Sequence, residues 1–113
     1  MTAALSFFEL GSVFQSKLLA ALIRKPKYLQ QVKDIMHPEY FSSDAAKWIF
    51  KEVCKYNQTY KTSPPAEFFK HKLEELDLEV LKVAIRQELK EVYKYYDSED
   101  LPYTEDVARK SLS

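Results

Sequence analysis

The sequence predicts one all-α domain over residues 1–113, a small orthogonal bundle of five or six helices. Apolar residues recur at spacings of three and four along most of the chain, which is the pattern of one helical face. The only glycine is Gly11, whereas a turn-rich β fold depends on glycine for its hairpins. Prolines lie between the apolar stretches and mark their ends, since proline disfavours helical geometry in the residue before it.

The first two predicted helices are separated by Pro26. Residues 13–24 form the first helix, and the segment before it, residues 1–12, is expected to be flexible. Residues 27–36 form the second helix, which Pro38 closes. The predicted apolar face of this second helix consists of Leu29, Val32, Ile35 and Met36.

The third predicted helix covers residues 45–60, and Ser43 or Asp44 offers its N-cap. Its expected core face consists of Ala46, Ile49, Phe50, Val53, Asn57 and Tyr60. A second stripe has basic residues at intervals of four and consists of Lys47, Lys51 and Lys55, with Trp48 beside it. The helix is therefore expected to bury one face and to present a basic stripe on another.

Two further helices and a short last one complete the predicted fold. Thr62 or Ser63 can cap the fourth helix, with Pro64 in its first position, and its apolar contacts are Phe68, Phe69, Leu73 and Leu76. Residues 77–96 are expected to form the longest helix, whose core stripe consists of Leu78, Leu81, Ile85, Leu89, Val92 and Tyr96. The sequence DSEDLP ends this helix, and a final helix capped by Thr104 reaches the end of the sequence.

The fifth predicted helix also carries apolar residues on a second side. Leu76, Val80, Val83 and Ala84 point broadly away from its core stripe. A helix that is apolar nearly all round is normally buried on both sides, and a domain of 113 residues has little material to cover both. We therefore expect another subunit to cover this second face.

The residue types present argue against catalysis. A nucleotide-binding P-loop or a dinucleotide fingerprint needs at least two glycines in a short span, and this chain has one. His71 and Glu75 have the i, i+4 spacing of a metal pair, but no third ligand accompanies them in the sequence. Cys54 has no base placed to activate it and is expected to pack. We predict a chain that is not an enzyme and holds neither a cofactor nor a metal.

The cysteine content and the ends of the sequence bear on the compartment. One cysteine cannot form a disulfide within the chain, which indicates a reducing environment. The first residues lack the basic start of a signal peptide, and no apolar run approaches the roughly 18 residues of a membrane helix. We therefore expect a cytoplasmic protein that does not enter a membrane.

The charges balance over the whole chain but not along it. The net charge is zero, which gives no electrostatic argument for non-specific DNA binding. Residues 1–61 carry nine Lys and Arg against five Asp and Glu, whereas residues 62–113 carry eight against twelve. This asymmetry could help two copies associate, although it carries no conclusion alone.

The basic stripe of the third helix has three interpretations. Lys47, Lys51 and Lys55, with Trp48 and Tyr56 nearby, could bind nucleic acid through phosphate contacts and base stacking. The same lysines could take an acidic surface of a partner protein. The commonest role of such a stripe is a solvated face whose aliphatic stems lie along the protein.

Residues 17–75 carry a series of packing features in a fixed order. They begin with a leucine-rich first helix ending near Pro26, a Pro-Glu-aromatic-Phe turn at residues 38–41, and an Ile-Phe pair at Ile49 in the centre of a long helix. A proline-marked turn then opens a helix that ends in Leu-Glu at Leu73. In these features residues 17–75 resemble the N-terminal domain of DnaB-type replicative helicases, particularly those of tailed phages. The sequence departs from the family in lacking a glycine before the turn proline and in lacking the motor domain.

The resemblance implies a non-catalytic collar domain that assembles on a helicase motor ring during DNA replication. It implies pairing of copies through a terminal helical hairpin, placed here at residues 77–113, and docking of primase or a helicase loader, with DNA contacted only indirectly. The expected interface residues are Leu76, Val80, Val83, Ala84, Lys47, Lys51 and Lys55. A phage-encoded chain would work in the bacterial host cytoplasm, and a full-length parent helicase would be an NTPase.

Two other functions remain open from the sequence. One is a free-standing small adaptor that regulates a replication protein, and the other is a weak nucleic-acid-binding module. Because the motor domain is absent, the chain is expected to be either an excised N-terminal domain or a phage protein that has kept only this domain.

Overall fold

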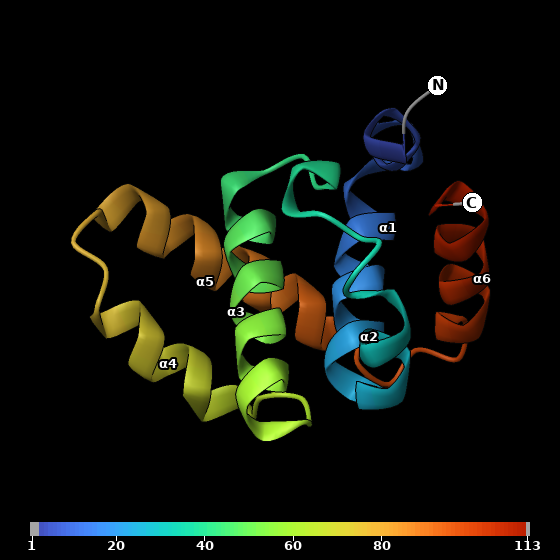
Figure 1. The fold of residues 1–113 in the computed structure, drawn as a ribbon. Helices are drawn as coiled ribbons and strands as arrows, with labels where there is room; N and C mark the ends of the chain where they lie inside the picture. Colours follow the sequence, from blue (N-terminus) through green and yellow to red (C-terminus); the bar gives the residue numbers. More distant parts are fainter. Residues whose placement is uncertain (1–2, 113) are drawn as a thin grey trace.

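The computed structural model describes residues 3–112, with side chains from Phe7 onward (Figure 1). Within this range the backbone forms six α-helices and one 3-10 turn and no strand, which confirms the predicted all-α class. None of these helices has the length and apolar composition needed to cross a membrane. The elements are, in order, α1 (Ala3–Arg24), α2 (Pro26–Val32), η1 (Pro38–Tyr40), α3 (Asp44–Tyr60), α4 (Ala66–Glu74), α5 (Glu79–Lys94) and α6 (Leu101–Leu112).

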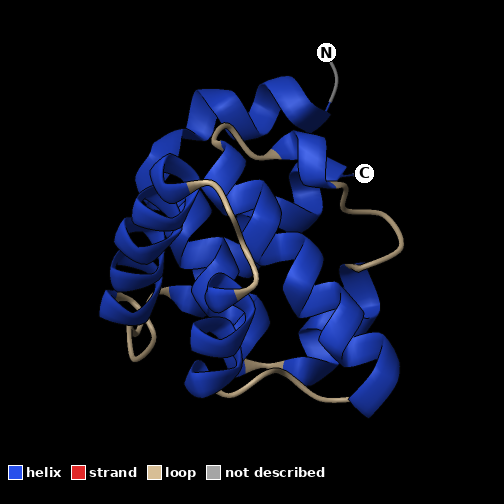
Figure 2. Ribbon diagram, turned by 90° about the vertical axis from the view of Figure 1, so that its left-hand side faces the viewer, coloured by secondary structure: helices blue, strands red, loops and turns tan. Residues whose placement is uncertain are grey.

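The central helix of the fold is α1, which contacts α2, α3, α5 and α6. In Figure 1, α6 lies alongside α1, and α5 crosses behind α3 toward the C-terminal end of α1. The Arg24 guanidinium donates a hydrogen bond of 3.0 Å to the Tyr96 carbonyl, which joins the ends of α1 and α5. Figure 2 shows the loops that connect the helices around this arrangement.

The expected hairpin at residues 77–113 is wrong, because its two arms do not pack on each other. α6 packs on α1, whereas α5 packs on α3 and α1. Two ion pairs of 2.6 Å, Lys17 with Asp100 and Lys25 with Glu105, join α1 to the start and the first turns of α6. The long loop after α5 therefore carries the chain to a different neighbour instead of turning it back.

A break in α1 at Gly11 brings Phe7 into the core. Gly11 has φ of +88°, a conformation that side-chain-bearing residues rarely adopt, and a Cβ there would meet no atom within 4 Å. The break lets Phe7 become fully buried with its ring edge-on to Phe14, Tyr40 and Phe41, at centroid distances of 5.8, 5.6 and 5.9 Å. Sequence periodicity places the first helix at residues 13–24, which matches the part of α1 after the break, and a short helical segment from Ala3 precedes it. The longest uninterrupted helix among the described residues is α3, with 17 residues, instead of residues 77–96.

The predicted core faces of α2 and α3 are largely confirmed, with two exceptions. Ile35 is exposed because α2 ends at Val32 and residues 33–35 form a turn instead of a helix. Tyr60 is exposed because it is the last residue of α3, where Lys61 adopts a left-handed conformation and the chain turns away. The buried members of the predicted faces of α2 and α3 include Leu29, Val32, Met36, Ala46, Ile49, Phe50, Val53 and Asn57.

The predicted helix caps have mixed outcomes. The Ala46 amide donates a hydrogen bond of 3.0 Å to the Ser43 hydroxyl, which confirms the cap of α3. The cap predicted for α4 is wrong, because a second proline follows Pro64 and excludes it from the helix, and the Ser63 hydroxyl instead donates to the Leu22 carbonyl. Thr104 is likewise not a cap, because α6 begins at Leu101 and the Thr104 hydroxyl donates to the Asp100 carbonyl within the first turn.

Candidate functional site

The N-terminal half of α5 exposes apolar side chains on the side away from the core. Val80 is 82% exposed and Val83 is 52% exposed, whereas Ile85, on the opposite side of the helix, is fully buried. Ala84 is also exposed, as the sequence predicts. Leu76 differs from the prediction, because it lies before α5 and packs partly against the core. The apolar face predicted for this helix is thus confirmed at Val80, Val83 and Ala84.

Leu78 joins this exposed surface although the sequence assigns it to the core stripe. α5 begins at Glu79, so Leu78 has an extended conformation with φ of −88° and ψ of 103° and does not follow the helical periodicity. Its side chain is exposed. A shift of two residues in the helix start, from residue 77 to Glu79, is therefore sufficient to move this leucine from the core to the surface.

The lysine stripe of α3 divides between two hollows. Lys47 and Lys51 lie beside Val80 and Ala84 in the groove between α3 and α5, whereas Lys55 lines a separate hollow between α3 and α4. Over the described part of the chain, none of the three lysines forms an ion pair or a side-chain hydrogen bond. The first two lysines therefore offer unneutralised positive charge at the edge of an apolar surface.

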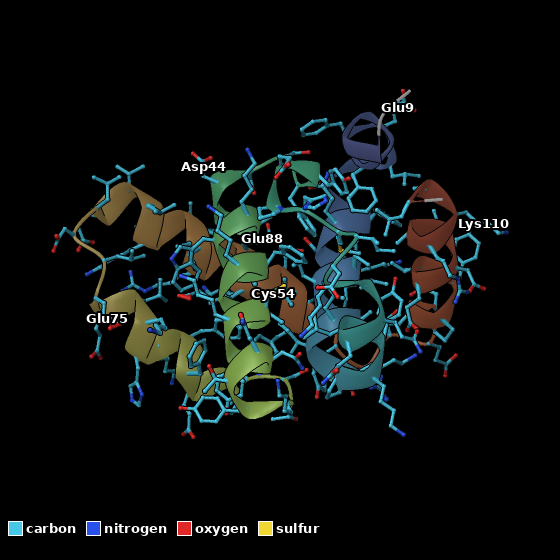
Figure 3. All side chains as sticks on the ribbon, in the orientation of Figure 1. Glu9, Asp44, Cys54, Glu75, Glu88 and Lys110 are labelled. Carbon is cyan, nitrogen blue, oxygen red and sulfur yellow. The ribbon has the colours of Figure 1, made fainter. Side chains whose placement is uncertain are left out.

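The groove between the N-terminal halves of α3 and α5 has a volume of about 550 Å³. Its floor is apolar, with the half-buried Trp48 ring on one side and Leu81 on the other. Lys47 and Lys51 form a basic rim, and Asp44 lies at the N-terminal end of α3 (Figure 3). The complete lining consists of Ser43, Asp44, Ala45, Lys47, Trp48, Lys51, Leu78, Val80, Leu81 and Ala84.

The thiol and phenol groups of the interior are not poised for nucleophilic chemistry. Burial raises the pKa of the Cys54 thiol to about 11, and burial together with Glu105 raises the pKa of the Tyr28 hydroxyl to about 12. Both groups are therefore protonated near neutral pH, and a protonated thiol is a weak nucleophile. Cys54 packs against the core, as the sequence predicts. Among the described residues, no three His, Cys, Asp or Glu side chains gather as a metal site would require.

Glu88 of α5 makes the stability of the fold depend on pH. Burial raises the pKa of the Glu88 carboxyl and Glu91 adds to the shift, whereas a hydrogen bond of 2.7 Å from the Ser16 hydroxyl opposes it. The native state therefore binds this proton more tightly than the unfolded chain does. As the pH falls from neutral through the native pKa, protonation of Glu88 increasingly stabilises the fold. The increase ends at about pH 4, because glutamate is then protonated in the unfolded chain as well.

We expect Glu88→Gln to melt at a higher temperature than the wild type at pH 7, because the amide removes a half-buried charge and can still accept from Ser16. The advantage should shrink as the pH approaches about 4, where the wild-type carboxyl becomes neutral. Thermal unfolding of both proteins across this range measures the effect. Glu99→Gln removes the same charge from an exposed position and is the control. An advantage that is independent of pH would contradict the assignment to Glu88.

Comparisons with models of protein families, with curated proteins and with solved structures find no match to this chain. The fold and the surface define a small all-α protein with an open apolar groove and a basic rim. The sequence predicts both sides of this groove, but as two separate surfaces. It misses the contribution of Trp48 and Leu81 to the floor, because the contact between α3 and α5 is not visible in either helix alone.

Proposed function

We infer that this chain is a non-catalytic assembly and docking domain that acts through protein contacts made by α5 and the groove beside it. The observation that carries this proposal is the exposure of Val80 and Val83 on a helix whose other side is already buried. Apolar side chains that gather on one face of a small protein are typical of an interaction site.

The setting we propose is DNA replication, because residues 17–75 resemble the N-terminal domain of DnaB-type helicases. In that setting the domain would pair helicase subunits and receive primase or a helicase loader in the cytoplasm of a bacterial host, without contacting DNA directly. The motor domain would supply NTP hydrolysis elsewhere in the parent protein. The all-α fold is compatible with this role but is shared by many unrelated proteins.

Two sides of α5 support two separate contacts. Val83 lies outside the lining of the groove and is available for pairing with a second copy, whereas Ala84 lies inside it. Val80 lines the groove and is also the most exposed of these residues. An isologous contact would place the same face of both copies together. Each of these apolar residues would then be buried in both copies. A stable interface of this kind usually buries about 800 Å² on each partner.

We expect the wild-type chain to associate reversibly and the double variant Val80→Lys, Val83→Lys to remain monomeric. Charged side chains on this face would have to lose their water without gaining a partner. Sedimentation velocity over a concentration series measures association, and circular dichroism checks that the variant keeps its helices. Tyr103→Lys, which alters an exposed aromatic on α6, is the control that should still associate.

Two results would contradict this proposal. A wild-type chain that stays monomeric at high concentration would show that this face does not pair with itself. A double variant that loses its helical circular dichroism would show that Val80 and Val83 stabilise the fold itself.

A further inference from the structure

We propose that the groove between α3 and α5 binds an amphipathic helix of a partner protein, with acidic residues beside its apolar stripe. This inference rests on the proposed docking function and specifies the chemistry of the partner. It concerns the groove alone, which involves α3, and not the outer face of α5 that carries Val83.

The shape and floor of the groove suit apolar side chains of a helix. Trp48, Leu81 and Ala84 line the groove, and they come from α3 and α5, which pack against each other. An amphipathic helix placed in such a groove inserts residues spaced by three and four, as in other helix-in-groove complexes.

The rim of the groove specifies the charge of the partner. Lys47 and Lys51 are one helical turn apart and have no ion-pair partner among the described residues. Acidic residues one turn apart on a bound helix would lie about 6 Å from each other, which matches this spacing. Asp44 is the one acidic residue of the lining and lies at one end of it. The acidic residues of a bound helix should therefore lie toward Lys51, away from Asp44.

A nucleic acid suits this groove less well than a peptide helix does. Trp48 is the only aromatic side chain in the lining, and the rest of the floor is aliphatic. Single-stranded nucleic acids are usually held by several stacking rings along a positively charged path. Two lysines with an aspartate beside them give a short path, and the whole chain has no net charge.

The single tryptophan of the chain lies in the groove and reports on its occupancy. We would select binders to the whole chain from displayed 18-residue helices with leucines fixed at helical spacing and Glu, Lys, Gln or Ala at the flanking positions. We expect enrichment of Glu at positions one turn apart. The enriched peptide, free of tryptophan, should shift the Trp48 emission to shorter wavelength in a saturable titration.

Charge reversals on the stripe provide the matched comparison. Lys51→Glu should weaken binding of the acidic peptide by about threefold to tenfold, and a peptide with Lys in place of Glu should recover that loss. Lys55→Glu makes the same change one turn along α3, outside the groove, and should leave binding unchanged. Val83→Lys should also leave binding unchanged, even where it abolishes self-association.

The outcomes separate this inference from the proposed function. Failure to enrich Glu, or equal losses from Lys51→Glu and Lys55→Glu, would overturn the groove assignment while self-association could still be intact. A single-stranded oligonucleotide that shifts Trp48 at lower concentration than any selected peptide would assign the groove to nucleic acid instead. If the chain binds the peptide but never self-associates, the assignment of the groove stands and only the proposed pairing of copies is wrong.

Discussion

Replacing Phe50 with alanine is expected to lower the free energy of unfolding by about 3–5 kcal/mol, the usual range for truncating a buried phenylalanine. Phe50 is 2% exposed, and the centre of its ring lies 5.2 Å from that of Phe41. The substitution would remove one side of this aromatic pair and leave a cavity between α3 and the turn that precedes it. Because small domains are stable by only about 5–15 kcal/mol, much of the population could unfold.

Urea denaturation measures this loss, with Lys55→Ala as the control on the same helix. Lys55 is exposed and forms no ion pair within the described residues, so its truncation should change the midpoint little. A melting temperature of Phe50→Ala within a degree or two of the wild type would show that this ring does not support the core.

Phe7→Ala is expected to have an effect of similar size, about 3–5 kcal/mol. The Phe7 ring is fully buried among three other aromatic rings. The backbone carbonyl of Phe7 accepts a hydrogen bond of 3.1 Å from the side-chain amide of Gln15. The same Gln15 side chain also bonds Ser42, so the turn at Gly11 is joined to the segment before α3. Loss of the ring should therefore loosen both the N-terminal turns and the η1 region.

Phe8→Ala provides a closely matched control, because the neighbouring ring is 44% exposed. Thermal unfolding of the two variants should show a large loss for Phe7 and a small one for Phe8. Equal losses would contradict the view that the N-terminal segment is held by Phe7. Hydrogen exchange at residues 38–41 should increase in Phe7→Ala alone, since Tyr40 and Phe41 lose a ring contact there.

The sequence predicts the helices well where one apolar face alternates with a solvated one. The stripe from Ala46 to Asn57 is buried as expected, and Ser43 caps its helix. Helix ends were less predictable because they depend on single residues. Pro65 moves the start of α4 two residues beyond the expected position, and the early start of α6 leaves Thr104 inside a helix.

The parts that sequence periodicity could not predict depend on contacts between distant segments. Phe7 lies in a stretch without a helical repeat, and its burial requires the unusual backbone of Gly11. The groove requires α5 to cross α3 near Trp48, and no pattern within α5 indicates that crossing. The packing of α6 on α1 likewise brings together residues far apart in the sequence, such as Lys25 and Glu105, which are 80 positions apart.

We propose that the outer face of α5 pairs with the same face of a second copy, and a cysteine placed at Val83 tests this pairing. In a Cys54→Ala background, Val83→Cys would place one thiol from each copy within the proposed interface, and a disulfide forms only when the Cβ atoms approach to about 4 Å. We predict a covalent dimer that forms under mild oxidation much faster than one from Tyr103→Cys, an exposed position on α6. Equal rates of cross-linking at the two positions would contradict the claim.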